Sequence, residues 1–175
     1  MDSGKKRACV VWHRRSGKDK TLINLMVKKM FERVGSYYYF LPTYKQGKKI
    51  LWDGMDRNGM RFLDHFPAQV VTKKNETELK LQVANGSIFQ IVGTDNYDSI
   101  MGSNPVGCVF SEYALQNPAA WDFIRPILAE NEGWAVFNFT PRGMNHGYEL
   151  FQMAERNQDW FCELLTVDDT RGSVS

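Results

Sequence analysis

A short apolar run, a basic loop and a long helical pattern follow one another near the N-terminus, and few folds accommodate that succession. Residues 8–12, ACVVW, have the length and the β-branched content of a buried strand. Residues 21–34, TLINLMVKKMFERV, repeat apolar side chains at helical spacing, and Gly35 follows as a stop. The loop WHRRSGKDKT, residues 12–21, connects them. A strand, a tight loop and a helix in this order predict a unit of a parallel α/β sheet.

The same alternation continues along the chain. Residues 78–93 alternate apolar and polar side chains on both sides of Asn85-Gly86, which predicts a β-hairpin inserted between parallel strands. We expect further strands at 36–42, 105–112, 134–141 and 160–167, and further helices from about Ile50 toward His65, from Asn117-Pro118 to Gly133, and from His146 to Asn157. The tail from Asp168 is expected to be unstructured. These elements predict an α/β, three-layer fold with a mostly parallel central sheet.

Length and composition limit the class of protein. A chain of 175 residues with 43% hydrophobic and 24% charged residues is typical of one soluble globular domain. The formal net charge of +2 permits a nucleic-acid partner without requiring one. Three scattered cysteines and three scattered histidines predict neither disulfides nor a zinc site. No apolar run approaches the length of a membrane span, so no membrane partner is expected.

The loop resembles a phosphate-binding loop with two departures. The usual pattern is G-x-x-x-x-G-K followed by Ser or Thr, and here Trp12 replaces the first glycine and Asp19 the hydroxyl residue. Lys18 opens the helix, so its ammonium group and the free amides of the helix N-terminus would converge on one anion. Arg14 and Arg15 add two cations. The alternative is a basic turn at the surface.

Two later strands end in polar residues of the kinds that nucleotide hydrolysis requires. In VGCVFSE, residues 106–112, Glu112 leaves a buried strand and is the candidate base that polarises the attacking water. Ser111 stands where an aspartate is usual, and its hydroxyl can hold a metal-bound water. In FNFTPRG, residues 137–143, the Thr140 hydroxyl would lie near the γ-phosphate. The alternatives are a solvent-facing glutamate and an ordinary Thr-Pro turn.

Taken in this order, WHRRSGKDKT, GCVFSEYA and FNFTPRG resemble the ATPase domain of the large terminase subunit of tailed bacteriophages. The resemblance covers about residues 7–166 and implies a P-loop NTPase fold of the RecA/ASCE type. It implies ATP and Mg²⁺ as cofactors, with the metal held through phosphate oxygens and waters. It further implies a motor that moves double-stranded DNA into a preformed capsid by ATP hydrolysis.

The resemblance also assigns roles to residues. Lys18 would cradle the β- and γ-phosphates, Arg14 or Arg15 would contact the γ-phosphate, Glu112 would activate water, and Thr140 would couple hydrolysis to movement. The nucleotide-binding loop would comprise Ser16, Gly17, Lys18, Asp19, Lys20 and Thr21. Candidate magnesium ligands are Asp19, Thr21 and Ser111. Met101 occupies the place where many terminases carry an arginine that acts across the subunit interface, which leaves Arg125 as a substitute candidate.

Partners and domain organisation follow from the same resemblance. The partners would be double-stranded DNA, the portal protein and the small terminase subunit, with a homo-oligomeric ring on the portal. The protein would act in the host cytoplasm, transiently at the portal vertex of the procapsid. We expect residues 1–175 to form a single ATPase domain whose segment 167–175 is a tail or the start of a linker to an absent nuclease domain. Asp168 and Asp169 then belong to a linker, and no DNA cleavage is expected. The alternatives are a helicase-like DNA-dependent ATPase and a nonhydrolysing nucleotide- or DNA-binding module.

Overall fold

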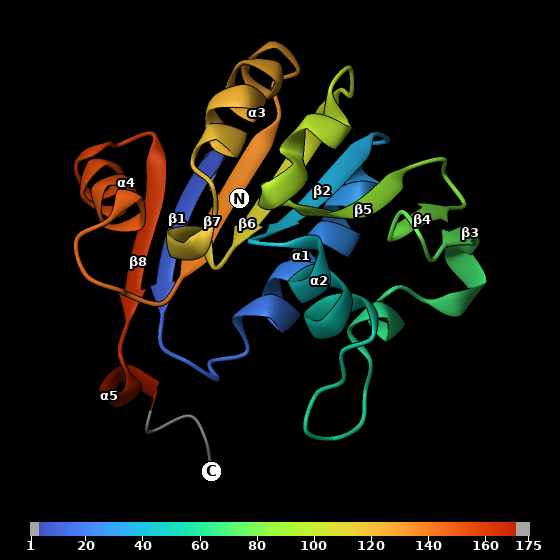
Figure 1. Ribbon diagram of the computed structural model, residues 1–175, viewed down its shortest axis with the longest axis horizontal. Coiled ribbons are helices and arrows are strands. Elements are labelled where there is room, and N and C mark those ends of the chain that lie inside the picture. The colour runs from blue at the N-terminus through green and yellow to red at the C-terminus, as the bar shows by residue number, and fades with distance from the viewer. Residues whose placement is uncertain (1–3, 171–175) are drawn as a thin grey trace.

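The computed structural model describes residues 4–170, which contain an eight-stranded sheet of order β3-β4-β5-β2-β6-β7-β1-β8 (Figure 1). The strands are β1 (Arg7–Trp12), β2 (Ser36–Leu41), β3 (Val71–Asn75), β4 (Lys80–Val83), β5 (Ile88–Gly93), β6 (Pro105–Ser111), β7 (Trp134–Phe139) and β8 (Trp160–Leu165). The α-helices are α1 (Lys18–Glu32), α2 (Tyr44–Gly47), α3 (Ala119–Glu130), α4 (His146–Arg156) and α5 (Val167–Thr170). Short helices of other types are η1 (Lys48–Trp52), η2 (Phe62–His65), η3 (Ala68–Val70), η4 (Thr94–Ile100, kinked at Asn96) and η5 (Tyr113–Leu115).

Six neighbouring strands run parallel, in the sheet order β5, β2, β6, β7, β1 and β8. Strands β3 and β4 extend the β5 edge by antiparallel pairing. This confirms the predicted α/β fold with a mostly parallel sheet. The hairpin across Asn85-Gly86 is also present, because β4 pairs with β5 and the Val83 amide donates to the Ser87 carbonyl at 3.0 Å. It does not separate two parallel strands, since β5 itself pairs with β2 and the extra strands lie at the sheet edge.

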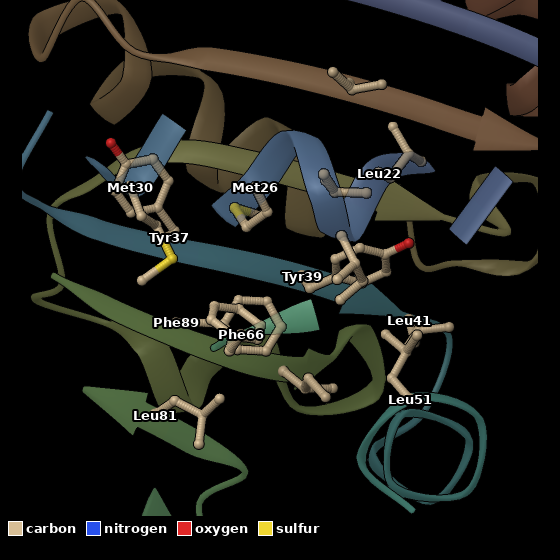
Figure 2. Packing of buried hydrophobic residues seen from close by; sticks show 14 of the residues in the cluster. Leu22, Met26, Met30, Tyr37, Tyr39, Leu41, Leu51, Phe66, Leu81 and Phe89 are labelled. Atoms are coloured by element: carbon tan, nitrogen blue, oxygen red, sulfur yellow. The ribbon is translucent and has the colours of Figure 1, made fainter. Parts of the chain in front are cut away.

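Side chains of each buried strand alternate between two apolar layers. Tyr37 and Tyr39 of β2 face α1, whereas Tyr38 and Phe40 face the layer beneath α3 and α4. Figure 2 shows Leu22, Met26 and Met30 of α1 packed over the first layer. Helices therefore cover both faces of the sheet, as its apolar strands require (Figure 1). Between residues 4 and 170, no helix combines the length and apolarity needed to cross a bilayer.

The helix predicted from about Ile50 toward His65 is wrong. The chain instead forms α2, a π-helical turn (η1) and a separate 3₁₀ turn (η2). A β-carbon at Gly54 would lie 1.8 Å from the Ile50 carbonyl oxygen, so the chain passes too close to itself for a regular helix with side chains. Asp56 then accepts hydrogen bonds from the Asn58 and Met60 amides at 2.8 and 3.0 Å, which stabilises a turn.

One smaller prediction also needed correction. The predicted unstructured tail begins instead with helical residues, because 168–170 belong to the short helix α5, and the Thr166 amide donates to the Asp169 carboxylate at 2.7 Å. The remainder of that predicted tail, residues 171–175, lies outside the described residues. The first helix begins at Lys18, as expected for the residue that follows the loop glycine, and its apolar pattern starts three residues later at Thr21. This start brings Lys18 into the first turn of α1.

Candidate active site

The carboxyl ends of three parallel strands meet at one point of the sheet edge. Strand β7 pairs with β1 on one side and with β6 on the other. The basic loop follows β1, Thr140 follows β7, and Glu112 follows β6. The basic loop therefore lies beside Glu112 and Thr140, which follow it by more than 90 positions in the sequence, and Thr140 is in the middle.

Lys18 joins these segments. Its Nζ atom donates a hydrogen bond to Thr140 Oγ1 at 3.0 Å and lies 2.8 Å from Glu112 Oε1. The lysine side chain is only 8% exposed, and that of Glu112 is 28% exposed. Gly17 precedes the lysine with φ of 77°, a left-handed conformation that glycine adopts at little cost, and the helix starts directly after it. The predicted ammonium group, carboxylate and hydroxyl thus form one contiguous cluster.

Glu112 owes its position to an unusual backbone conformation. Its φ and ψ of 57° and 42° are left-handed, which costs a residue with a side chain about 1–2 kcal/mol. The buried Gln116 amide group holds the preceding strand end by donating to the carbonyls of Ser111 and Phe40 at 2.7 and 3.0 Å. Sequence reasoning missed Gln116 because nothing local distinguishes it from the polar residues around it.

A second polar cluster surrounds Asp19, in the first turn of α1. Its Oδ1 atom accepts hydrogen bonds from the hydroxyls of Ser111 and Tyr39, each at 2.7 Å. Both donors are fully buried. Burial, followed by the charge of Asp19, raises the pKa of Tyr39 well above its usual range, so the phenol remains a proton donor. Figure 2 shows the Tyr39 hydroxyl directed toward the N-terminal end of α1.

Asn138 extends this cluster beneath the sheet edge. Its side-chain oxygen lies 3.3 Å from Ser111 Oγ and 3.5 Å from the Glu112 amide nitrogen. The residue is fully buried, and its Nδ2 atom has no hydrogen-bond partner among the described residues. Sequence reasoning missed both Tyr39 and Asn138. An asparagine inside the apolar run WAVFNF was the available signal, because a buried strand tolerates a polar residue only where it finds partners.

The other loop residues lie around this centre. Arg14 and Arg15 are exposed, and Arg15 is left-handed with φ of 62°. Ser16 Oγ is buried and has no hydrogen-bond partner in the described part of the chain, so the loop holds an unused polar group. Lys20 Nζ lies 3.5 Å from Asp56 Oδ2, and the Thr21 side chain is exposed. The structure therefore brings Asp19 and Ser111 together but leaves Thr21 outside that contact.

These residues fit a magnesium nucleotide. Mg²⁺ in phosphate-transfer sites commonly takes one or two carboxylates together with phosphate oxygens and waters, and Asp19 supplies such a carboxylate. The unpartnered Ser16 hydroxyl and the N-terminal amides of α1 are donors suited to phosphate.

The two positions considered for an arginine that acts between subunits lie elsewhere. Met101 is 67% exposed in the loop before β6, and Arg125 is exposed on α3. Within residues 4–170, no hydrogen bond or ion pair connects either one to Lys18.

The chain is similar in sequence to large terminase subunits, although no protein-family model matches it. It is 29% identical over 167 residues to the terminase large subunit of Thermus virus P23-45, covering 86% of this chain and 34% of the relative. Against the terminase large subunit of Escherichia phage T5 it is 29% identical over 82 residues, covering 45% of this chain and 19% of the relative. The chain therefore spans about a third of the length of the first relative.

Solved structures share its fold. The ATPase domain of the Thermus phage P74-26 large terminase superimposes with a TM-score of 0.77 at 22% identity, covering 95% of this chain and 78% of that domain. The large terminase of another thermophilic bacteriophage, in complex with ATP-gamma-S, gives a TM-score of 0.73 at 15% identity, covering 97% of this chain and 42% of that protein. Sequence similarity confirms the resemblance predicted from the three motifs, and the superpositions show that the chain has the fold of large terminase ATPase domains.

Proposed function

We propose that this chain is the ATP-hydrolysing motor domain of a viral DNA-packaging terminase. The observation that carries the proposal is the contact of Lys18 Nζ with both Glu112 and Thr140 at the carboxyl edge of a parallel sheet. Hydrolysis needs a cation for the phosphates and a base for the attacking water at the same place, and this arrangement supplies both. The similarity to large terminase subunits supports the same conclusion.

Each residue has a distinct role in the proposed reaction. Lys18 turns from Glu112 to the β- and γ-phosphates when ATP binds, and Arg14 or Arg15 stabilises the charge that develops on the γ-phosphate. Glu112, released from the lysine, accepts a proton from the water that attacks in line. Asp19 would hold Mg²⁺, which when bound would neutralise phosphate charge. Thr140 senses the γ-phosphate through Lys18 and couples hydrolysis to movement of DNA.

The same proposal covers the partners and the extent of the domain. Residues 7–166 act as one ATPase unit, and double-stranded DNA is the translocated polymer. The unit works as a ring of identical copies with the portal protein and the small terminase subunit, at the portal vertex in the host cell. We assign no nuclease chemistry to it. A trans-acting arginine would come from a neighbouring copy, for which Arg125 stays a candidate.

Phosphate release from ATP with Mg²⁺ tests the enzymatic core. Lys18→Ala should lower the rate by about 10²–10³-fold, and Glu112→Gln by about 10²–10⁴-fold. Lys29 and Glu32 form a comparable pair on α1, 2.6 Å apart, so Lys29→Ala and Glu32→Gln are matched controls that should retain the rate. ATP binding without phosphate release in the unaltered chain would support the nonhydrolysing module instead.

A packaging assay tests the coupling role. Thr140→Ala should bind ATP with nearly unchanged affinity but should translocate DNA poorly, because the lysine loses the hydroxyl that links it to β7. The assay combines purified portal-bearing procapsids, DNA and the protein, and it measures nuclease-protected DNA. Packaging at the unaltered rate by this variant would show that Thr140 has no coupling role.

A further inference from the structure

The two departures from the standard phosphate-loop pattern are reciprocal. In standard P-loop ATPases a hydroxyl residue follows the loop lysine, an aspartate ends the neighbouring strand, and the two hold Mg²⁺ together. Here the residue after Lys18 is Asp19, and the residue that ends β6 is Ser111. A carboxylate stands where the hydroxyl is usual, and a hydroxyl stands where the carboxylate is usual. Each change alone would disable the pair, but together they preserve its chemical composition.

The structure brings these two exchanged residues into direct contact. Ser111 Oγ donates to Asp19 Oδ1 at 2.7 Å, across 92 positions of sequence. We infer that Asp19 and Ser111 form the magnesium-binding pair of this site, with the carboxylate supplied by helix α1 and the hydroxyl by strand β6. This inference rests on the proposed function and specifies how this chain holds the metal of its nucleotide. The charge at the site is that of one carboxylate in either arrangement, which suits a cation already coordinated by phosphates.

Tyr39 has a positioning role in this exchanged pair. Its hydroxyl donates to the same Oδ1 atom as Ser111, so two buried donors fix one oxygen of the carboxylate. In residues 4–170 no hydrogen bond to Asp19 Oδ2 is found, which leaves that oxygen available to a cation. Hydrogen bonds from outer residues commonly orient metal-binding carboxylates in this way. Tyr39 itself is not a ligand in this inference.

Exchanging the two residues back tests the inference. The variants are Asp19→Ser, Ser111→Asp and the double variant, and the measurement is the affinity for a fluorescent ATP analogue with Mg²⁺ and with EDTA. Asp19→Ser leaves two hydroxyls and no carboxylate at the pair. The factor by which Mg²⁺ increases nucleotide affinity should therefore fall about tenfold to a hundredfold. The double variant should recover at least about tenfold of that loss, because residues in contact are not additive.

Thermal melting without nucleotide gives an independent readout. Ser111→Asp alone places two carboxylates at a buried contact, so its melting temperature should fall, and Mg²⁺ should raise it again. The double variant has one carboxylate and should melt close to the unaltered chain. Asp53→Ser combined with Ser99→Asp has the same composition and involves exposed residues, so it is the matched control and should change neither readout. Tyr39→Phe should weaken the Mg²⁺ effect on nucleotide affinity by several-fold while leaving affinity in EDTA unchanged.

The outcomes separate this inference from the proposed function. Suppose that the unaltered chain shows Mg²⁺-dependent nucleotide binding, and that the double variant loses as much of the Mg²⁺-dependent affinity as the two single variants together. The magnesium-binding role of the Asp19–Ser111 pair is then refuted, and the ATPase proposal stands. If the unaltered chain binds no nucleotide with or without Mg²⁺, the proposed function fails and the inference fails with it. Recovery in the double variant supports both.

Discussion

Replacing Glu112 by glutamine should destabilise the nucleotide-free protein and at the same time tighten ATP binding. Lys18 Nζ and Glu112 Oε1 lie 2.8 Å apart, which corresponds to an attraction of about 6 kcal/mol at an effective dielectric constant of about 20. Desolvation offsets much of this attraction, and the glutamate is 28% exposed. We therefore expect a loss of about 1–2 kcal/mol in the free energy of unfolding, below the 3–5 kcal/mol typical of a fully buried pair that loses one partner.

Nucleotide affinity should change in the opposite direction, because Lys18 cannot pair with Glu112 and cradle the phosphates at once. In the proposed function ATP displaces the carboxylate in the unaltered chain, and the glutamine variant removes that competitor. The same 1–2 kcal/mol then appears as an increase in affinity of about five- to thirtyfold. The variant should therefore bind ATP more tightly although it hydrolyses ATP far more slowly.

Two measurements check this prediction. Urea unfolding without nucleotide gives the free energy of unfolding, and calorimetric titration with ATP in the presence of Mg²⁺ gives the dissociation constant. Glu32→Gln is the control, since it removes the partner of Lys29 on the same helix without approaching the site. Unchanged stability together with unchanged or weaker ATP binding in Glu112→Gln would refute the idea that nucleotide displaces this ion pair.

Three further predictions concern the framework of the site. Gly107→Ala should cost about 1–3 kcal/mol in urea unfolding, because its new methyl group would lie about 2.5 Å from the Trp134 indole; an unchanged midpoint would contradict this close approach. Asn145→Ala removes the cap of α4 and should cost about 0.5–2 kcal/mol in the same assay, whereas Asn145→Ser should retain most of the stability. The pKa of Asp56 is lowered because two backbone amides of the following turn donate to its carboxylate. The ionised carboxylate therefore stabilises the folded protein above the ordinary Asp pKa, and this stabilisation is lost as the pH falls below about 4. Asp56→Asn should accordingly flatten the pH dependence of urea unfolding between about pH 5 and pH 3, and parallel curves for the two proteins would contradict this assignment.

The fold and the centre of the site could be predicted because their signals are local. The run ACVVW and the helical pattern after Gly17 each occupy a few consecutive residues, and their order alone defines a unit of a parallel sheet. Since parallel strands present their carboxyl ends on one edge, Glu112 and Thr140 could be assigned to the same site without knowledge of any contact. The contact of both with Lys18 required the strand order, in which β7 lies between β1 and β6.

The missed features depend on contacts between distant segments. Tyr39 appears in the sequence as one of three consecutive tyrosines, and only the pairing of β2 with β6 brings it to Asp19. The strand β3 escaped notice because VTKKN lacks an apolar alternation, which is common in charged strands that protect a sheet edge. The helix predicted before His65 was wrong for a different reason. Apolar residues do recur there at helical spacing, but the backbone at Gly54 passes close to the Ile50 carbonyl oxygen and the chain does not continue as a helix.

The left-handed conformation of Glu112 explains how one strand serves both clusters. Side chains of β6 alternate, with Val109 in the layer that faces α1 and Phe110 in the layer that faces α3. Ser111 continues the alternation and points toward α1, where it meets Asp19. An extended backbone would direct Glu112 to the opposite face, away from Lys18, whereas φ of 57° turns the chain and returns the carboxylate to the lysine. The strain of about 1–2 kcal/mol is comparable to the net contribution expected from the ion pair, so the pair offsets it. Consecutive residues can therefore contact Asp19 and Lys18, which are themselves consecutive on α1.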